Sequence, residues 1–278
     1  MTIEWDYDEV AEELPFRTDL YRGTAPFYDR FRLPYPEELM NHLRQRLPAS
    51  GTGRLLDLAC GTGQIAFPLA AYFAEVWAVD QEEESVAYGR AKAEASRISN
   101  ITWVSGPAES VALDGAFELI AVGNAFQRLN RQLVAERMYT WLQPGGGAAL
   151  LWGGTPWRGE HSWQTAMAEL FEDWMAKAGA TDRVPAGWEA AMDQDPHEQV
   201  LRRAGFRYDG RFEFSVKQTW TVEALTGFVY STSFLNREAL GEELLLFERD
   251  LAEQLLSYEP DGNLEVLATY VYELARKP

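Results

Sequence analysis

The amino-acid sequence predicts an α/β fold in which helices cover both faces of a mostly parallel sheet. Three observations lead to this prediction. From residue 54 to residue 154, short apolar runs alternate with longer amphipathic ones, the pattern of strands joined by crossover helices. A glycine-rich turn directly follows the first apolar run. With 46% hydrophobic residues in a chain of 278, a full core can be buried, so we expect one doubly wound domain with additions.

The expected elements follow in chain order. Five strands, each near the typical length of about five residues, are expected at 55–58, 75–79, 101–105, 119–122 and 148–152. Helices between them are expected at 63–73, 82–96 and 129–142, the last ending before the breaker Pro144-Gly145-Gly146-Gly147. Beyond them we expect helices at 162–178, 197–204 and 238–256, a β-rich segment at 206–220, and an edge or antiparallel strand at 264–274.

Charge and composition argue against several classes of protein. The formal net charge is −18 at pH 7 without a Lys/Arg-rich run, so phosphate backbones are repelled and nucleic acids are poor substrates. No apolar run approaches the ~20 residues that cross a bilayer, and the start of the chain is acidic where a signal peptide is basic. The single cysteine, Cys60, supplies no disulfide or thiolate cluster. We expect a cytoplasmic protein without metal. Its acidic surface is compatible with steering of cationic small molecules and also with solubility alone.

The segment that carries the chemistry is the turn after the first strand. Gly61 and Gly63 let the backbone approach a ligand, because no side chain intervenes. This spacing alone also fits a dinucleotide-binding fold. Asp57, at the end of the strand, would oppose a pyrophosphate but suits a cationic amino-acid group. Asp80, seventeen residues after Gly63, ends the second strand, where a carboxylate can accept hydrogen bonds from ribose hydroxyls.

Four ordered segments resemble the class I S-adenosylmethionine-dependent methyltransferase family, over most of residues 15–160. They are LLDLACGTG at 55–63, SGPAE at 105–109, VGNAFQR at 122–128 and the turn LQPGGGAALLW from residue 142. The resemblance implies a seven-stranded Rossmann-like sheet, S-adenosylmethionine as cofactor and S-adenosylhomocysteine as product. A small-molecule substrate is the implied partner, whereas the oligomeric state is left open.

The resemblance also assigns cofactor-binding residues. In the family the aspartate and the glycine turn contact the methionine part of the cofactor, the acidic residue of the second strand binds the ribose, and the next residue lies beside the adenine. Pro107 stands where the family usually has an aspartate for the adenine amino group, which leaves the Ala108 backbone and the Glu109 carboxylate for that role. The implied cofactor residues in these segments are Asp57, Ala59, Gly61, Gly63, Asp80, Gln81, Ala108, Glu109 and Asn124.

The N-terminal segment looks like the lid of small-molecule members of this family. By that resemblance, Arg32 pairs with the cofactor carboxylate through a forked ionic contact. Tyr28 or Tyr35 closes over the sulfonium, and both are candidate substrate-binding residues. The resemblance divides the chain into a helical lid at 1–50 and a methyltransferase domain at 51–278, with helical cap insertions at about 155–198 and 221–260.

Substrate and catalytic candidates lie beyond the fourth and fifth strands. Gln127 occupies a position that is histidine in many relatives, and a glutamine cannot act as a general base. Trp157 follows the fifth strand, on the edge where open α/β sheets bind ligands, and is the first aromatic candidate for the pocket. On the same loop, His161 is the candidate catalytic base and Glu160 a candidate for binding an amine. His42, His197 and Cys60 are expected to be structural.

The sequence thus predicts methyl transfer from S-adenosylmethionine to a nitrogen or oxygen atom of a small metabolite. An amino sugar or another natural-product intermediate is the expected acceptor, with an apolar aromatic or polyketide-like molecule as the alternative. A non-methylating, cyclase-like enzyme that keeps the cofactor pocket stays open as a second reading. An NAD-dependent dehydrogenase is a third possible function, but it does not explain why Asp57 and the Pro-Gly-Gly turn are present.

Overall fold

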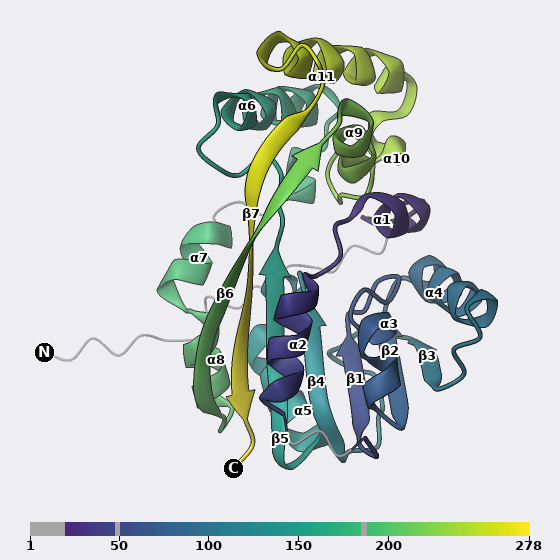
Figure 1. The fold of residues 1–278 in the computed structure, drawn as a ribbon, viewed down its shortest axis with the longest axis vertical. Helices are drawn as coiled ribbons and strands as arrows, with labels where there is room; N and C mark the ends of the chain where they lie inside the picture. The colour runs from purple at the N-terminus through teal and green to yellow at the C-terminus, as the bar shows by residue number, and fades with distance from the viewer. Residues whose placement is uncertain (1–19, 48–50, 185–187) are drawn as a thin grey trace, which may run out of the picture.

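A seven-stranded sheet forms the centre of the computed structural model, which describes residues 20–47, 51–184 and 188–278. The strand order is β3-β2-β1-β4-β5-β7-β6, and only β7 runs antiparallel to its neighbours β5 and β6 (Figure 1). The strands are β1 (Arg54–Leu58), β2 (Glu75–Asp80), β3 (Ile101–Ser105), β4 (Phe117–Gly123), β5 (Leu142–Gly153), β6 (Arg207–Trp220) and β7 (Leu264–Arg276). The predicted doubly wound, seven-stranded fold is confirmed.

Two apolar cores lie on opposite faces of this sheet. One contains buried residues of α2 (Glu37–Gln45), α3 (Ala66–Leu69) and α4 (Glu83–Ala95), with η2 (Ala70–Tyr72) between the last two. The other contains α5 (Arg131–Trp141) and α8 (His197–Arg203). Because β1, β4 and β5 are covered on both faces, most of their residues are buried and apolar, with Asp57 and Glu118 as buried exceptions.

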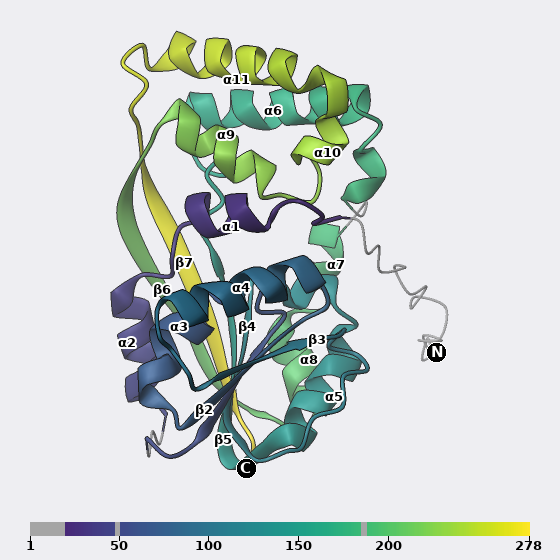
Figure 2. The same ribbon diagram turned by 90° about the vertical axis from the view of Figure 1, so that its right-hand side faces the viewer.

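A separate helical layer lies beyond the carboxyl ends of the parallel strands (Figures 1 and 2). It consists of α6 (Ser162–Lys177), α9 (Val222–Tyr230), α10 (Arg237–Leu240) and α11 (Leu244–Tyr258), which share a third apolar core. The pair β6–β7 reaches this layer: it stays paired as far as Trp220 and Leu264, whereas β5 pairs with β7 only up to Gly153 and Tyr270. We call this helical layer the cap.

The first described helix, α1 (Ala25–Phe31), joins the sheet to the cap. It packs against α9, where Gly227 leaves room for the ring of Phe31: a Cβ on that glycine would clash with it. The remaining short elements are η3 (Phe126–Arg128), η4 (Thr181–Arg183), α7 (Trp188–Gln194) and η5 (Gly241–Glu243).

Most element predictions are confirmed, and the exceptions have local causes. The helix expected at 63–73 is wrong over its first three residues, because the turn continues to Ile65 before α3 begins. The helix expected at 238–256 is divided into α10, η5 and α11, since Gly241 adopts φ +50°. The strand at 264–274 is antiparallel, as expected, but lies inside the sheet because β6 takes the edge. Helix α7 was not predicted, and residues 1–19 of the expected lid lie outside the described residues.

Two surveys of the described residues bear on function. No helix among them is both long and apolar enough to cross a bilayer. Nor do they bring together three or more His, Cys, Asp or Glu side chains that could hold a metal ion.

Candidate cofactor site at the glycine turn

The chain makes an open turn where β1 ends and α3 has not yet begun. Ala59, Gly61 and Gly63 have φ of 56°, 54° and 94°, in the left-handed region that favours glycine. At Gly63 space is also short, because a Cβ would lie 2.7 Å from the ring of Trp103. Glycine is therefore required at this position, and the turn presents its backbone where a ligand of an open α/β sheet binds.

Two buried carboxylates, Asp57 and Asp80, hold this turn by hydrogen bonds to its backbone and to the segments beside it. Asp57 is 1% exposed and accepts a hydrogen bond from the backbone N–H of Ala66 at 2.8 Å. Asp80 accepts from the N–H of Gly61 at 2.7 Å through Oδ2 and from that of Glu82 at 2.9 Å through Oδ1. Each N–H donor fixes one segment of backbone, so the two side chains set the shape of the turn.

Burial raises the pKa of both carboxyl groups. The pKa of Asp57 rises from 3.8 to about 7, chiefly by desolvation, while the N–H of Ala66 acts against the rise and the charge of Asp80 adds to it. The pKa of Asp80 is also raised by burial, against three backbone N–H groups that lower it. Within residues 20–47, 51–184 and 188–278, no cationic side chain is among the groups that shift the pKa of Asp57. Its negative charge therefore favours a cation bound near the turn.

The structure places the expected adenine residues after β2 and β3. Gln81 is half-buried and directly follows Asp80, and Ala108 is buried at 5% exposure. The carboxylate of Glu109 instead accepts a hydrogen bond from the N–H of Asn130 at 3.0 Å, just before α5. Glu109 thus already has a structural partner, and the role expected for the backbone of Ala108 stays a prediction.

The ends of β4 and β5 are joined by a compact polar cluster. Asn124, with φ of 53°, accepts from the N–H of Gly153 at 3.2 Å and donates from Nδ2 to the Tyr35 hydroxyl at 3.1 Å. Gln127 donates from Nε2 to the carbonyl of Asn124 at 3.2 Å. The Tyr35 hydroxyl donates in turn to the carbonyl of Leu151 at 3.4 Å. Three residues predicted separately, Tyr35, Asn124 and Gln127, are therefore one hydrogen-bonded group.

Residues of α1 and the following loop cover the glycine turn. The ring of Tyr28 lies over Gly61, where a Cβ would be 3.6 Å from Tyr28 Cε1. Arg32 donates from Nε to Ser231 Oγ at 2.7 Å, and its guanidinium lies 4.2 Å from the ring centre of Phe228 and 5.0 Å from that of Tyr28. Arg32 therefore ties this segment to the cap, a partner that the sequence did not suggest.

The predicted residues of the loop after β5 lie with the cap. The Trp157 ring packs edge-on against Phe171, Phe228 and Phe234 in its apolar core. Glu160 and His161 are exposed at the start of α6, where the backbone N–H of His161 donates to Gln164 Oε1 at 3.2 Å. None of the described contacts joins them to the turn or to the polar cluster at the ends of β4 and β5.

One histidine expected to be structural lies nearer that polar cluster. The His197 ring packs against Phe126 in η3 and Trp152 in β5, with centroid distances of 5.2 and 5.4 Å. Burial lowers its pKa to about 4, with the charge of Arg131 adding to the fall, so the imidazole is neutral at pH 7. No sequence signal identified this placement, because His197 is 71 residues from Phe126 and meets it only in the fold.

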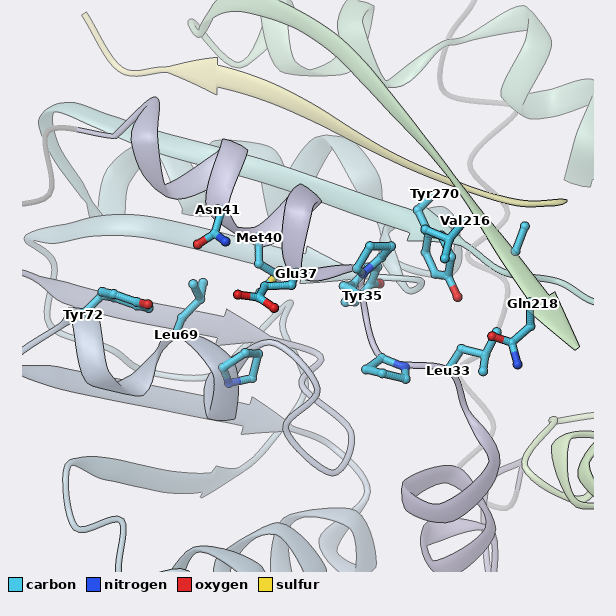
Figure 3. Close-up of a pocket in the computed structure, with 14 residues that line it drawn as sticks. Leu33, Tyr35, Glu37, Met40, Asn41, Leu69, Tyr72, Val216, Gln218 and Tyr270 are labelled. Carbon is cyan, nitrogen blue, oxygen red and sulfur yellow. The ribbon is translucent and has the colours of Figure 1, made fainter.

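A cavity of about 500 Å³ opens beside the cofactor site, between α2, α3 and the pair β6–β7 (Figure 3). The glycine turn is not part of its wall, but Tyr35 is, together with Tyr270 of β7. We call this cavity the α2 groove.

Comparison with known sequences identifies the central segment. Residues 55–146 match a family model described as a methyltransferase domain. Over 132 residues the chain is 26% identical to the malonyl-[acyl-carrier protein] O-methyltransferase of Bacillus cereus, covering 45% of this chain and 48% of that protein. Over 66 residues it is 44% identical to a tRNA/tmRNA (uracil-C(5))-methyltransferase of Idiomarina loihiensis, covering 23% of this chain and 18% of that protein. The chain thus spans less than half the length of either relative.

Solved structures extend the similarity of the fold to most of the chain. A candidate type II methyltransferase from Anaeromyxobacter dehalogenans matches with a TM-score of 0.62 at 20% identity, covering 88% of this chain and 97% of that one. The [4+2]-cyclase SpnF matches with a TM-score of 0.52 at 18% identity, covering 89% and 84%. At such identities the likeness concerns the fold alone.

Proposed function

We propose that this chain transfers a methyl group from S-adenosylmethionine to a nitrogen or oxygen atom of a small molecule in the cytoplasm. The proposal starts from the family to which the chain belongs, the class I S-adenosylmethionine-dependent methyltransferases. The observation that carries the proposal is the open glycine turn with Asp57 below it and Asp80 beside it. S-adenosylhomocysteine is then the product.

The residues around the turn fit this cofactor. The raised pKa of Asp57 and its lack of a cationic partner suit an ammonium group above the turn. Asp80 accepts from the N–H of Gly61 through Oδ2 and from that of Glu82 through Oδ1, and its carboxylate oxygens have lone pairs left for the ribose hydroxyls. Ala59, Gly61 and Gly63 offer backbone atoms to the amino-acid part, while Gln81 and Ala108 flank the adenine. Arg32 would reach the cofactor carboxylate only by sharing its guanidinium with Ser231.

Bound S-adenosylmethionine supplies a methyl group on a positively charged sulfur. The protein can promote its transfer by alignment, which is worth several kcal/mol when the reacting atoms are held about 3–3.5 Å apart in line. Tyr35, Asn124 and Gln127 form the rigid polar wall for that alignment, because each is fixed by a hydrogen bond to its neighbours. The pKa of the Tyr35 hydroxyl is raised well above its usual value by burial, so this group donates or accepts a hydrogen bond but remains neutral.

The acceptor is a small molecule with an amine or hydroxyl group. The net charge of −18 favours a cationic acceptor such as an amino sugar over an RNA, although three relatives are named as RNA methyltransferases. Trp157, half-buried against the apolar core of the cap, is the aromatic candidate for contact with the acceptor on that side. His161 and Glu160, expected from the sequence to accept a proton and to bind an amine, are exposed and have no described contact with the polar cluster, so no step of the proposed transfer uses them.

Isothermal titration with S-adenosylhomocysteine, with NADH as the control, tests the cofactor. Micromolar binding of S-adenosylhomocysteine alone is expected, and binding of NADH alone would indicate an NAD-dependent dehydrogenase. Transfer of tritium from methyl-labelled S-adenosylmethionine to amino sugars, hydroxylated aromatics and tRNA then tests the reaction. Labelling of a small molecule supports the proposal, whereas labelling of tRNA alone refutes it. Cofactor binding with no labelled product across the acceptor panel would favour a cyclase-like enzyme.

A further inference from the structure

Arg32 lies where the cover of the glycine turn meets the cap. Its backbone carbonyl accepts a hydrogen bond at 3.5 Å from Nε2 of Gln64, the residue that follows Gly63. Its guanidinium lies 5.0 Å from the centre of the Tyr28 ring, which covers Gly61. Burial raises the pKa of the Tyr28 hydroxyl, the charge of Arg32 acts against the rise, and both buried carboxylates of the site add to it. Arg32 therefore places a positive charge beside the turn, on the side that α1 covers.

The cap holds one edge of this guanidinium. Nε of Arg32 donates to Ser231 Oγ at 2.7 Å, and Nη2 donates to the Ser231 carbonyl at 3.3 Å. Ser231 is fully buried at the C-terminal end of α9, where its hydroxyl donates to the carbonyl of Phe228 at 2.5 Å. Because the hydroxyl proton points to that carbonyl, Oγ faces Arg32 as an acceptor. The cap thus sets the orientation of the Nε–Nη2 edge.

Two aromatic rings fix the position of the same group. The guanidinium carbon of Arg32 lies 4.2 Å from the ring centre of Phe228, closer than to Tyr28. Phe228 is itself buried in the apolar core of the cap. The planar, weakly hydrated guanidinium is suited to such contacts with aromatic faces. The group is therefore held by the cap through one ring and one hydroxyl.

The opposite edge of the guanidinium keeps its donors for a ligand. An arginine side chain has five N–H donors, and the bonds to Ser231 use one on Nε and one on Nη2. The remaining donors lie along the Nη1–Nη2 edge, which binds a carboxylate by two parallel hydrogen bonds. Within the described part of the chain, no carboxylate forms an ion pair with Arg32. A carboxylate is thus the ligand group that fits this edge.

We propose that Ser231 is a positioning residue for cofactor binding: it holds Arg32 so that the Nη1–Nη2 edge binds the carboxylate of the amino-acid part of S-adenosylmethionine. The inference rests on the proposed function, which puts this amino-acid part at the glycine turn. It gives the cap a part in selecting the cofactor, through a buried hydroxyl that lies 199 residues from Arg32 in the chain.

Two ligands that differ only in this carboxylate test the inference: S-adenosylhomocysteine and its decarboxylated analogue, in which a hydrogen replaces the carboxylate. In calorimetry the wild-type protein is expected to bind S-adenosylhomocysteine at least about tenfold more tightly, because the analogue lacks the charge-assisted hydrogen bonds. Ser231→Ala is expected to reduce this preference at least about threefold, with the affinity for the analogue unchanged within about twofold. An unchanged preference, or an equal loss of affinity for both ligands, would overturn the positioning role.

Ser233→Ala is the matched control. Ser233 is buried in the same loop, but its hydroxyl accepts a hydrogen bond from Arg128 at 3.2 Å and none from Arg32. This variant is expected to keep the full preference for S-adenosylhomocysteine, and a loss as large as that of Ser231→Ala would contradict the inference. Ser231→Cys, whose thiol is a weaker acceptor, replaces Ser231→Ala should that variant fail to fold.

Arg32→Lys tests the other partner of the contact. It keeps the charge, but a lysine ammonium does not offer one edge to Ser231 and a second to a carboxylate. The variant is therefore expected to lose most of the preference for S-adenosylhomocysteine over the analogue. A preference retained in Arg32→Lys would refute the forked contact.

The two ligands also separate failure of this inference from failure of the proposed function. Binding of both with equal affinity to the wild-type protein would refute the inference, because the edge of Arg32 would then not bind the cofactor, and would leave the proposed function standing. Binding of neither ligand would refute the proposed function, and the inference with it.

Discussion

Asp57→Asn should remove a pH dependence that the wild-type protein shows in cofactor binding. In the wild-type protein burial raises the pKa of Asp57 to about 7, and a ligand ammonium group above the turn favours the ionised carboxylate. Below pH 7 this carboxyl is increasingly protonated, so the apparent Kd for S-adenosylhomocysteine should rise as the pH falls. For a pKa of about 7, the factor of (1 + 10^(pKa − pH)) gives a roughly tenfold weaker affinity at pH 6 than at pH 8.

Calorimetry in two buffers of different ionisation enthalpy measures the same effect as a proton count. At pH 7 about half of the Asp57 carboxyls are protonated, so binding should release roughly half a proton per site. Asp57→Asn should bind more weakly, with a flat pH profile and no such release. Titration of the ligand itself appears equally in both proteins, so the difference between them isolates Asp57.

The free energy of unfolding falls with rising pH, whereas the cofactor affinity rises, and this opposite dependence provides a control. A folded-state pKa raised from 3.8 to about 7 means that the native protein holds the proton more tightly than the unfolded chain. The free energy of unfolding therefore falls as the pH rises from about 4 to 7, by about 4 kcal/mol for this one group at 1.36 kcal/mol per pKa unit. Asp57→Asn should escape this loss and be more stable than the wild type at pH 8 in urea unfolding.

Glu273→Gln is the matched variant, because burial also raises the pKa of Glu273 from 4.5 to about 7, on the opposite face of the sheet from α2. It too should gain stability at pH 8, but its cofactor binding should keep the tenfold pH dependence. A wild-type profile that is flat from pH 6 to 8, or an Asp57→Asn profile that keeps the slope, would refute the role given to Asp57.

Three further variants test the site. In Gly63→Ala the backbone has φ of 94° and the new Cβ lies 2.7 Å from the Trp103 ring, so urea unfolding should show a loss of about 2–4 kcal/mol in unfolding free energy. Gly145→Ala has φ of 78° but open space around the new Cβ, so it should lose about 1–2 kcal/mol, and equal losses would contradict the packing argument. Asp80→Asn should weaken S-adenosylhomocysteine binding at least tenfold in calorimetry, because hydrogen bonds to a charged group contribute about 1.5–3 kcal/mol. An unchanged affinity would show that Asp80 does not bind the ribose. His161→Ala should keep methyl transfer within about threefold, because this exposed side chain has no described contact with the polar cluster, and a tenfold loss of kcat would establish it as the base.

The sequence predicted best what short-range signals determine. The strands and the turn at Gly61 and Gly63 are encoded in consecutive residues, by apolar runs and by glycines at positions of positive φ. The limits of α3 were predicted less well, because its start depends on the bond from the Ala66 N–H to Asp57, nine residues earlier. In the same way the long helix near the C-terminus is broken by one residue, Gly241.

Side-chain partners across long separations could not be predicted. Arg32 was assigned to the cofactor by resemblance, but in the fold it bonds Ser231, 199 residues away. The α2 groove depends on the register that places Tyr270 opposite Gly153, which no local pattern specifies. Tyr35 was identified as a site residue, yet its position between the groove and the polar cluster follows only from the packing of α2 on the sheet.

The way the C-terminal part of the cap is inserted has a consequence for diversification. Residues 221–263 leave the sheet after Trp220 and return at Leu264, and these two residues are partners in the β6–β7 ladder. Paired strands lie ~5 Å apart, so a segment of another length can close the same gap at small entropic cost. Helices α9, α10 and α11 can therefore be exchanged without shifting the strand register, provided that the replacement for α9 keeps partners for Phe31 and Arg32, which tie the cover of the glycine turn to it. The length and sequence of this segment can thus vary while the strands that carry the glycine turn stay in register.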